Sequence, residues 1–156
     1  MHEKAKLAAA RHFLDRMHAE HGDPTAFALE LGAFLGESRS ALQHAWKEAT
    51  QKPGGQFWYE QRMADPLLCF FRDLRNSSIH EVPVKPLTKR KSVVAPFLSI
   101  GDDDDEFLIP YPHDTTVHWY EFEERPGDEV TELAQQYLKA LDAVVADGVA
   151  MGWISG

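Results

Sequence analysis

The sequence lacks several features that would point to familiar classes of protein. It has one cysteine, Cys69, so no disulfide can form within the chain, and a site built from several thiolate ligands is disfavoured. Cys69 lies in an apolar run at residues 67–71, which predicts a buried, unreactive thiol. No apolar run approaches the ~18 residues of a membrane span, and the first residues show no apolar signal-peptide core. The expectation is a cytoplasmic protein.

Basic charge is also scarce. The chain has 25 acidic and 16 basic residues and a formal net charge of −9, which argues against broad electrostatic binding to nucleic acid. A single focused basic site stays compatible with that total, because local potential steers a ligand. The chain has no glycine-rich phosphate loop, nucleophile elbow or dinucleotide fingerprint. Its histidines show no metal-ligand spacing, so no metal or cofactor is expected.

Apolar residues recur at helical spacing through most of the chain. The length of 156 residues fits one domain, 1–156, and the pattern predicts helices over about 3–21 and 25–51, and a final helix opening at 126–128. Gly32 and Gly36 in the second helix suggest close approach by a neighbouring helix. The predicted stripe of that helix is Leu31, Phe34, Leu35, Ser38, Leu42, Ala45, Trp46 and Ala49.

Two shorter helices and a β segment are expected between the second and last helices. An aromatic helix covers about 56–63, and Asp65-Pro66 then reads as the N-cap and first position of a helix that runs toward His80. Residues 92–122 carry strand-like patterns around an acidic run at 102–106, which is most simply a polar hairpin tip. The sequence therefore predicts a mainly α fold of four or five helices, with two or three antiparallel strands before the last helix.

The chemically distinctive segment is Arg75-Asn76-Ser77-Ser78-Ile79-His80, at the expected end of a helix. Arginine offers a forked cation to phosphate oxygens, and histidine exchanges protons near neutral pH, so the pair suits phosphodiester cleavage without a metal. On an ideal helix a five-residue step turns about 500°, which leaves the two side chains ~140° apart. They converge if the helix ends or distorts near residues 77–78, or if a second subunit completes the site. Spacing alone favours a simpler role, a helix C-cap.

Other polar residues are candidates for supporting roles. Arg72 shares a helix face with Asn76 and His80. Glu37 and Arg39 flank Ser38, where they either reach His80 or form a solvated flank. The main basic cluster either guides RNA backbone to the site or forms a solvated loop with strand-edge protection. Its members are Lys85, Lys89, Arg90 and Lys91.

The segment from Arg75 to His80 resembles the Arg-polar-x3-His motif of the HEPN superfamily, whose members are helical bundles, commonly dimeric. The resemblance covers about residues 25–84 and includes the helix with residues 34–42 and the approach at 70–74. Many members are metal-independent endoribonucleases of toxin–antitoxin and defence systems, and others are catalytically silent. One group has a tyrosine two residues after the histidine, where this chain has Val82.

The resemblance implies that Arg75 binds the scissile phosphate, His80 acts as acid and base, and Asn76 orients one of them. The leading hypothesis is a homodimeric endoribonuclease that cleaves RNA by 2′-hydroxyl attack and is held in check by an antitoxin or regulatory protein. The alternative is a non-catalytic HEPN-like module that binds a nucleotide, an RNA or a protein. A third possibility is that Arg75 and His80 only cap a helix.

Overall fold

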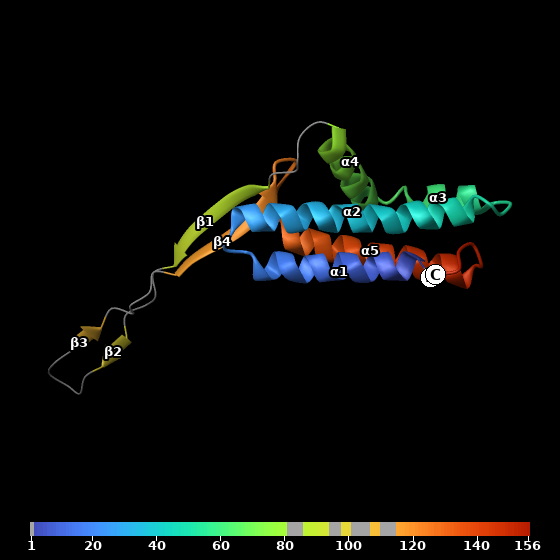
Figure 1. Ribbon diagram of the computed structural model, residues 1–156. Helices are drawn as coiled ribbons and strands as arrows, with labels where there is room; N and C mark the ends of the chain where they lie inside the picture. Colours follow the sequence, from blue (N-terminus) through green and yellow to red (C-terminus); the bar gives the residue numbers. More distant parts are fainter. Residues whose placement is uncertain (1, 81–85, 94–97, 101–106, 110–114) are drawn as a thin grey trace.

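The computed structural model describes residues 2–80, 86–93, 98–100, 107–109 and 115–156. Side chains are described throughout these ranges except at 77–80, 91–93, 98–100, 107–109 and 115–117. This part of the chain forms five helices: α1 (His2–Ala19), α2 (Pro24–Ala49), α3 (Gly55–Arg62), α4 (Pro66–His80) and α5 (Val130–Ala150). Figure 1 shows α1, α2 and α5 lying lengthwise against one another, with α4 crossing them steeply.

Two aspartates begin the helices that matter most for the site. Asp23 precedes α2, and its Oδ1 accepts the backbone N–H groups of Thr25 at 2.8 Å and Ala26 at 3.1 Å. Asp65 caps α4 in the same way, accepting from Leu67 at 2.8 Å and Leu68 at 3.1 Å. Each cap satisfies N–H groups that have no partner within the helix. The prediction that Asp65-Pro66 opens a helix is confirmed.

The centre of the core is a cluster of aromatic rings. Phe71 of α4 stacks on Tyr137 of α5 with ring centroids 4.2 Å apart and planes 6° apart. Phe34 of α2 packs edge-on against both rings, at 6.3 and 6.1 Å. The apolar stripe of α5 is buried in full. Its members are Val130, Leu133, Ala134, Tyr137, Leu138, Leu141, Val144 and Val145.

A small antiparallel sheet precedes α5, as predicted, but its extent differs. Strands β1 (Leu87–Val93), β4 (Thr115–Phe122) and β5 (Arg125–Glu129) pair in the order β1-β4-β5, and β2 (Leu98–Ile100) pairs with β3 (Phe107–Ile109). The expected β segment, 92–122, was therefore too short at both ends. The last helix begins at Val130 rather than at 126–128, because 125–129 pair with β4. Glu129 then caps α5 by accepting from the N–H of Glu132 at 2.9 Å.

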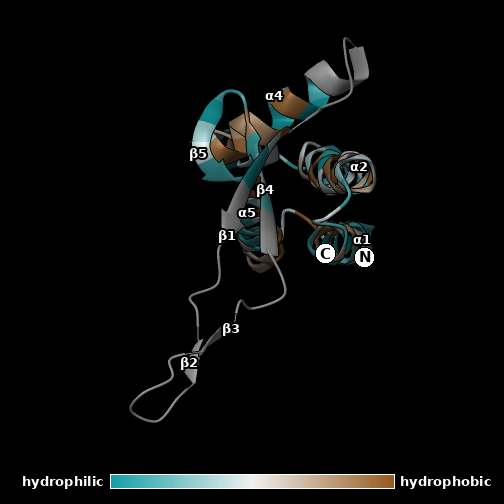
Figure 2. Ribbon diagram, turned by 90° about the vertical axis from the view of Figure 1, so that its left-hand side faces the viewer, coloured by the Kyte–Doolittle hydropathy of each residue, from teal (hydrophilic) through white to brown (hydrophobic). Residues whose placement is uncertain are grey.

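The sheet is anchored to the helices through Tyr120, near the C-terminal end of β4. Tyr120 stacks on Phe27 of α2 at 3.7 Å and donates its hydroxyl proton to the carbonyl oxygen of His21 at 2.8 Å. Figure 2 shows the first, apolar turns of α4 beside β4 and β5, and the rest of that helix leading away from the bundle. The acidic run 102–106 lies outside the described residues. None of the described helices combines the length and apolar character needed to cross a bilayer.

Two smaller expectations are not met. Cys69 is half-buried rather than buried, and its thiol donates to the carbonyl oxygen of Met63 at 3.0 Å. Gly32 and Gly36 do not mark a close helix contact, because a Cβ atom added at either position would meet nothing within 4 Å. A Cβ at Gly148 of α5 would instead lie 2.7 Å from the Trp58 ring and 2.9 Å from Ile154.

These surroundings predict opposite effects for the same substitution at two helical glycines. Gly32→Ala should raise the free energy of unfolding by about 0.5–1 kcal/mol, because alanine restricts the unfolded chain and meets no neighbour. Gly148→Ala should lower it by about 1–3 kcal/mol through overpacking. Urea unfolding of both variants measures the two changes. Equal effects at the two positions would contradict the packing described.

Candidate functional site

The predicted motif occupies the last turns of α4. Arg75 is half-buried and Asn76 is exposed, whereas the side chains of 77–80, including His80, lie outside the described residues. The backbone is helical through His80, so α4 does not end near residues 77–78. Ideal helical geometry then places positions 75 and 80 about 140° apart around the axis. Helix termination therefore does not bring positions 75 and 80 together within one chain.

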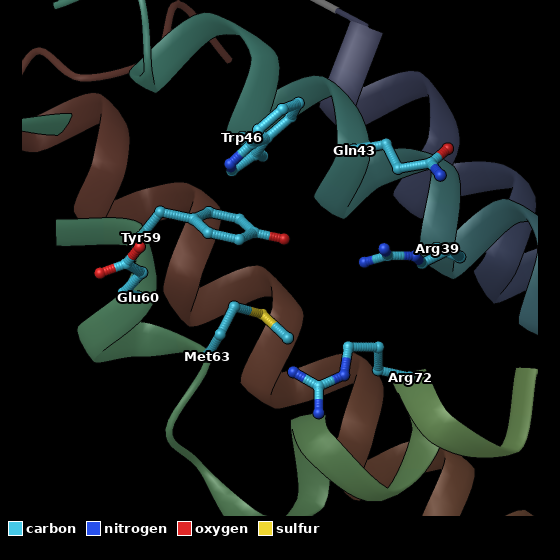
Figure 3. A pocket seen from close by; sticks show the side chains of 7 residues that line it. All are labelled: Arg39, Gln43, Trp46, Tyr59, Glu60, Met63 and Arg72. Atoms are coloured by element: carbon cyan, nitrogen blue, oxygen red, sulfur yellow. The ribbon is translucent and has the colours of Figure 1, made fainter. Parts of the chain in front are cut away.

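Two of the predicted supporting residues, Arg39 and Arg72, meet in a pocket of about 390 Å³. Arg39 comes from α2 and Arg72 from α4, and both guanidinium groups extend into the same space (Figure 3). We call this cavity the two-arginine pocket. Its lining residues are Arg39, Gln43, Trp46, Tyr59, Glu60, Met63 and Arg72.

Buried neighbours in the sequence fix the pocket residues in place. Arg72 follows Phe71, and Arg39 follows Ser38, which is fully buried. Tyr59 follows Trp58, whose indole N–H donates to Asp147 of α5 at 2.6 Å. Arg39, Tyr59 and Arg72 are thus each next to a residue that packs in the core or bonds to α5.

The two guanidinium groups have different surroundings. The Nε of Arg72 donates to the neighbouring Asp73 carboxylate at 2.9 Å, and this hydrogen bond raises the pKa of Arg72. None of the ion pairs between described side chains involves Arg39. Two cations that share a cavity repel each other, and an anion between them removes that repulsion. Paired guanidinium groups bind phosphate or carboxylate oxygens through several parallel hydrogen bonds.

Tyr59 lines the pocket, and its side chain extends toward Arg39 in Figure 3. Burial raises the pKa of the Tyr59 phenol, while the charges of Arg39 and Arg72 partly offset that rise. The phenol therefore keeps its proton at neutral pH. It offers the pocket a neutral hydroxyl group beside two permanent cations.

Glu37 lies apart from these groups. Its carboxylate forms an ion pair with Lys6 of α1 at 2.9 Å. A two-residue step turns a helix by about 200°, so Glu37 and Arg39 occupy nearly opposite sides of α2. Glu37 thus links α2 to α1, and Arg39 alone of this pair lines the pocket.

The predicted basic cluster is only partly described. Lys85 lies outside the described residues, as does the side chain of Lys91. Lys89 and Arg90 are exposed on β1, which begins at Leu87, and consecutive strand residues point to opposite faces. The Nζ of Lys89 lies 4.0 Å from Glu121 of β4. Lys89 and Arg90 therefore do not share one continuous surface.

Sequence reasoning missed the aromatic part of the pocket. Trp46 was placed in the buried stripe of α2, but its side chain is 50% exposed. Tyr59 and Met63 were treated only as members of a short aromatic helix, although both line the cavity. The sequence held one signal of this. Ala45 and Trp46 are consecutive members of the predicted α2 stripe, so the stripe is wider there than elsewhere.

Comparison of the chain with protein-family models, curated proteins and solved structures finds no match.

The buried tyrosines predict a loss of stability at high pH. Burial raises the pKa values of Tyr59, Tyr120 and Tyr137 above that of a free phenol, about 10. Above about pH 10 the unfolded chain releases these protons first, so the free energy of unfolding falls as pH rises. Below about pH 10 this contribution is fully present. Urea unfolding from pH 8 to 11 should show a shallower fall in Tyr137→Phe than in wild type, and equal slopes would contradict the assignment.

A second prediction distinguishes Trp46, which lines the pocket, from Trp58, which lies in the core. Trp58→Ala should cost about 3–5 kcal/mol, because the side chain is only 4% exposed and its N–H group is bonded to Asp147. Trp46→Ala should cost about 1 kcal/mol or less, because half of that side chain already faces solvent. Urea unfolding of the two variants tests the difference. A large loss in Trp46→Ala would show that Trp46 is a core residue.

Proposed function

We propose that this protein is a HEPN-like, metal-independent endoribonuclease that cleaves single-stranded RNA. The observation that carries the proposal is the convergence of Arg39 and Arg72 beside α4, the helix that also bears the motif from Arg75 to His80. The two arginines supply a focused cationic site in a chain whose net charge is −9. An RNA phosphate bound by Arg39 and Arg72 would contact α4, the helix that carries the proposed reacting groups.

The face shared by positions 72, 76 and 80 gives the RNA a path. These positions are four residues apart, and the eight-residue step from Arg72 to His80 rises ~12 Å along α4. Asn76 is exposed between them and offers both a donor and an acceptor. A single strand that leaves the two-arginine pocket along this face meets Asn76 and then position 80.

The chemistry uses the 2′-hydroxyl group of the RNA as the nucleophile. His80 takes the 2′-hydroxyl proton as that oxygen attacks phosphorus, the bond from phosphorus to the 5′-oxygen of the next nucleotide breaks, and the leaving oxygen takes a proton from water. Arg75 binds the phosphate oxygens and stabilises the charge that develops on them. The products are a 2′,3′-cyclic phosphate and a 5′-hydroxyl end.

The proposed enzyme is a homodimer with composite sites. Because α4 stays helical to His80, Arg75 and His80 of one chain occupy different sides of the helix. A two-fold partner that lays its own α4 alongside brings Arg75 of one chain to His80 of the other. Each dimer then has two equivalent sites. An antitoxin or regulatory protein that covers α4 inhibits both.

The second candidate is a HEPN-like module that binds a nucleotide or RNA without cleaving it. Two observations favour it: the acidic net charge, and a pocket whose walls combine arginine with tryptophan and tyrosine, as a binding site requires. Binding without strand cleavage is the outcome that distinguishes this module from the enzyme.

The proposal predicts metal-independent cleavage that depends on His80. Purified wild-type protein should cut a fluorescent single-stranded RNA in excess chelator and leave 2′,3′-cyclic phosphate ends. His80→Ala should lose at least about a hundredfold in rate, because acid–base catalysis supplies about 10²–10⁴. His18→Ala is the matched control, since His18 is exposed on α1. Circular dichroism checks that each variant is folded.

Mixing inactive variants tests the composite site. Arg75→Ala and His80→Ala chains mixed in equal amounts and allowed to exchange should recover about a quarter of wild-type activity, because half of the chains enter heterodimers with one intact site of two. No recovery in proven heterodimers would rule out a site shared between chains. Absence of cleavage by wild-type protein, together with RNA binding, would leave the binding module as the function.

A further inference from the structure

The two-arginine pocket has distinct aromatic and cationic ends. In Figure 3 the Trp46 and Tyr59 rings lie on one side of the cavity, and the guanidinium groups of Arg39 and Arg72 lie on the other. Tyr59 is 8% exposed and Met63 is 7% exposed, so both of these lining residues are well packed. The pocket therefore offers a flat apolar surface next to a phosphate-binding group.

Trp46 lines the pocket but is not buried in the core. A tryptophan side chain gains stability when it is buried, yet this one is 50% exposed at the edge of the cavity. An exposed aromatic ring beside arginines is a common platform on which proteins stack the bases of single-stranded nucleic acids. Phe57 of α3 is also exposed, at 66%, but it does not line the pocket.

We propose that the two-arginine pocket binds one nucleotide, with its base stacked on Trp46 and its phosphate held by Arg39 and Arg72. The cavity volume of about 390 Å³ falls within the ~300–1,000 Å³ range of small-molecule sites. The Tyr59 hydroxyl group lies on the cationic side and donates to a phosphate or ribose oxygen. A free phosphate uses only the arginines, whereas a nucleotide also uses the aromatic wall.

The inference deepens the proposed function and rests on it for the role of the bound unit. In an endoribonuclease this nucleotide is one residue of the RNA strand, recognised away from the cleaved bond. Recognition there orients the strand along α4 and places a neighbouring phosphodiester near the motif. The pocket residues are accordingly binding residues, and the reacting groups remain those of the motif.

Calorimetric titration of the 156-residue chain with small ligands tests the pocket directly. The probes are the four ribonucleoside 5′-monophosphates, the matching nucleosides and inorganic phosphate, at low salt. Nucleoside monophosphates should bind about tenfold or more tightly than inorganic phosphate, because stacking adds to the phosphate contacts. They should also bind about tenfold or more tightly than nucleosides, which lack the charged group.

Single substitutions assign the two ends of the ligand. Arg39→Gln and Arg72→Gln should each weaken nucleotide binding by on the order of ten- to a hundredfold, whereas Arg11→Gln on α1 should leave it unchanged. Trp46→Ala should reduce nucleotide affinity to that of inorganic phosphate, and Phe57→Ala should not. Inorganic phosphate should bind Trp46→Ala as it binds wild type, which shows that the variant is folded.

Several results would overturn the proposal. They are the absence of nucleotide binding, equal affinity for phosphate and nucleotides, equal affinity for nucleosides and nucleotides, and full binding by both arginine variants. The assay contains no cleavable RNA, so its result is independent of the ribonuclease test. Nucleotide binding without RNA cleavage would support the nucleotide site and contradict the proposed ribonuclease activity. RNA cleavage without nucleotide binding would support the ribonuclease activity and contradict the nucleotide site.

Discussion

The stacked rings of Phe71 and Tyr137 are the contact on which the arrangement of the site depends. They join α4 to α5, and Phe34 packs edge-on against both, so three helices meet at one aromatic cluster. Phe122 of β4 packs edge-on against Phe71, with ring centroids 6.0 Å apart, and so joins the sheet to the cluster. Because Arg72 follows Phe71 directly, this cluster also sets where its guanidinium group enters the pocket.

Much of the fold follows from local rules that the sequence displays openly. The stripe of α5 has a single period and is buried in full, and Asp65 caps α4 because an aspartate before a proline suits that role. The predicted start of the last helix was wrong because of a contact between distant parts of the fold. Pro126-Gly127-Asp128 resembles a helix opening, but backbone pairing with β4 extends the strand to Glu129 before the cap forms.

The site was only partly predictable, because its geometry depends on how the helices pack. Helical periodicity shows which residues share a face but not where that face stops being covered, so Trp46 was assigned to the core. Arg39 and Arg72 were singled out separately, on different helices, and only the crossing of α2 and α4 shows that they share a cavity. Glu37 and Arg39 both flank Ser38 in the sequence. Because they are two residues apart, they lie on nearly opposite sides of α2, and Glu37 pairs with Lys6 instead of lining the pocket.

The steep crossing of α4 has a consequence for the dynamics of the molecule. α4 packs against the sheet and α5 through Phe70 and Phe71 in its first turns and then leads away from the bundle (Figures 1 and 2). A ligand that bridges Arg39 and Arg72 ties the middle of α4 to α2. Occupancy of the pocket would then slow amide hydrogen exchange in the helix that carries the motif.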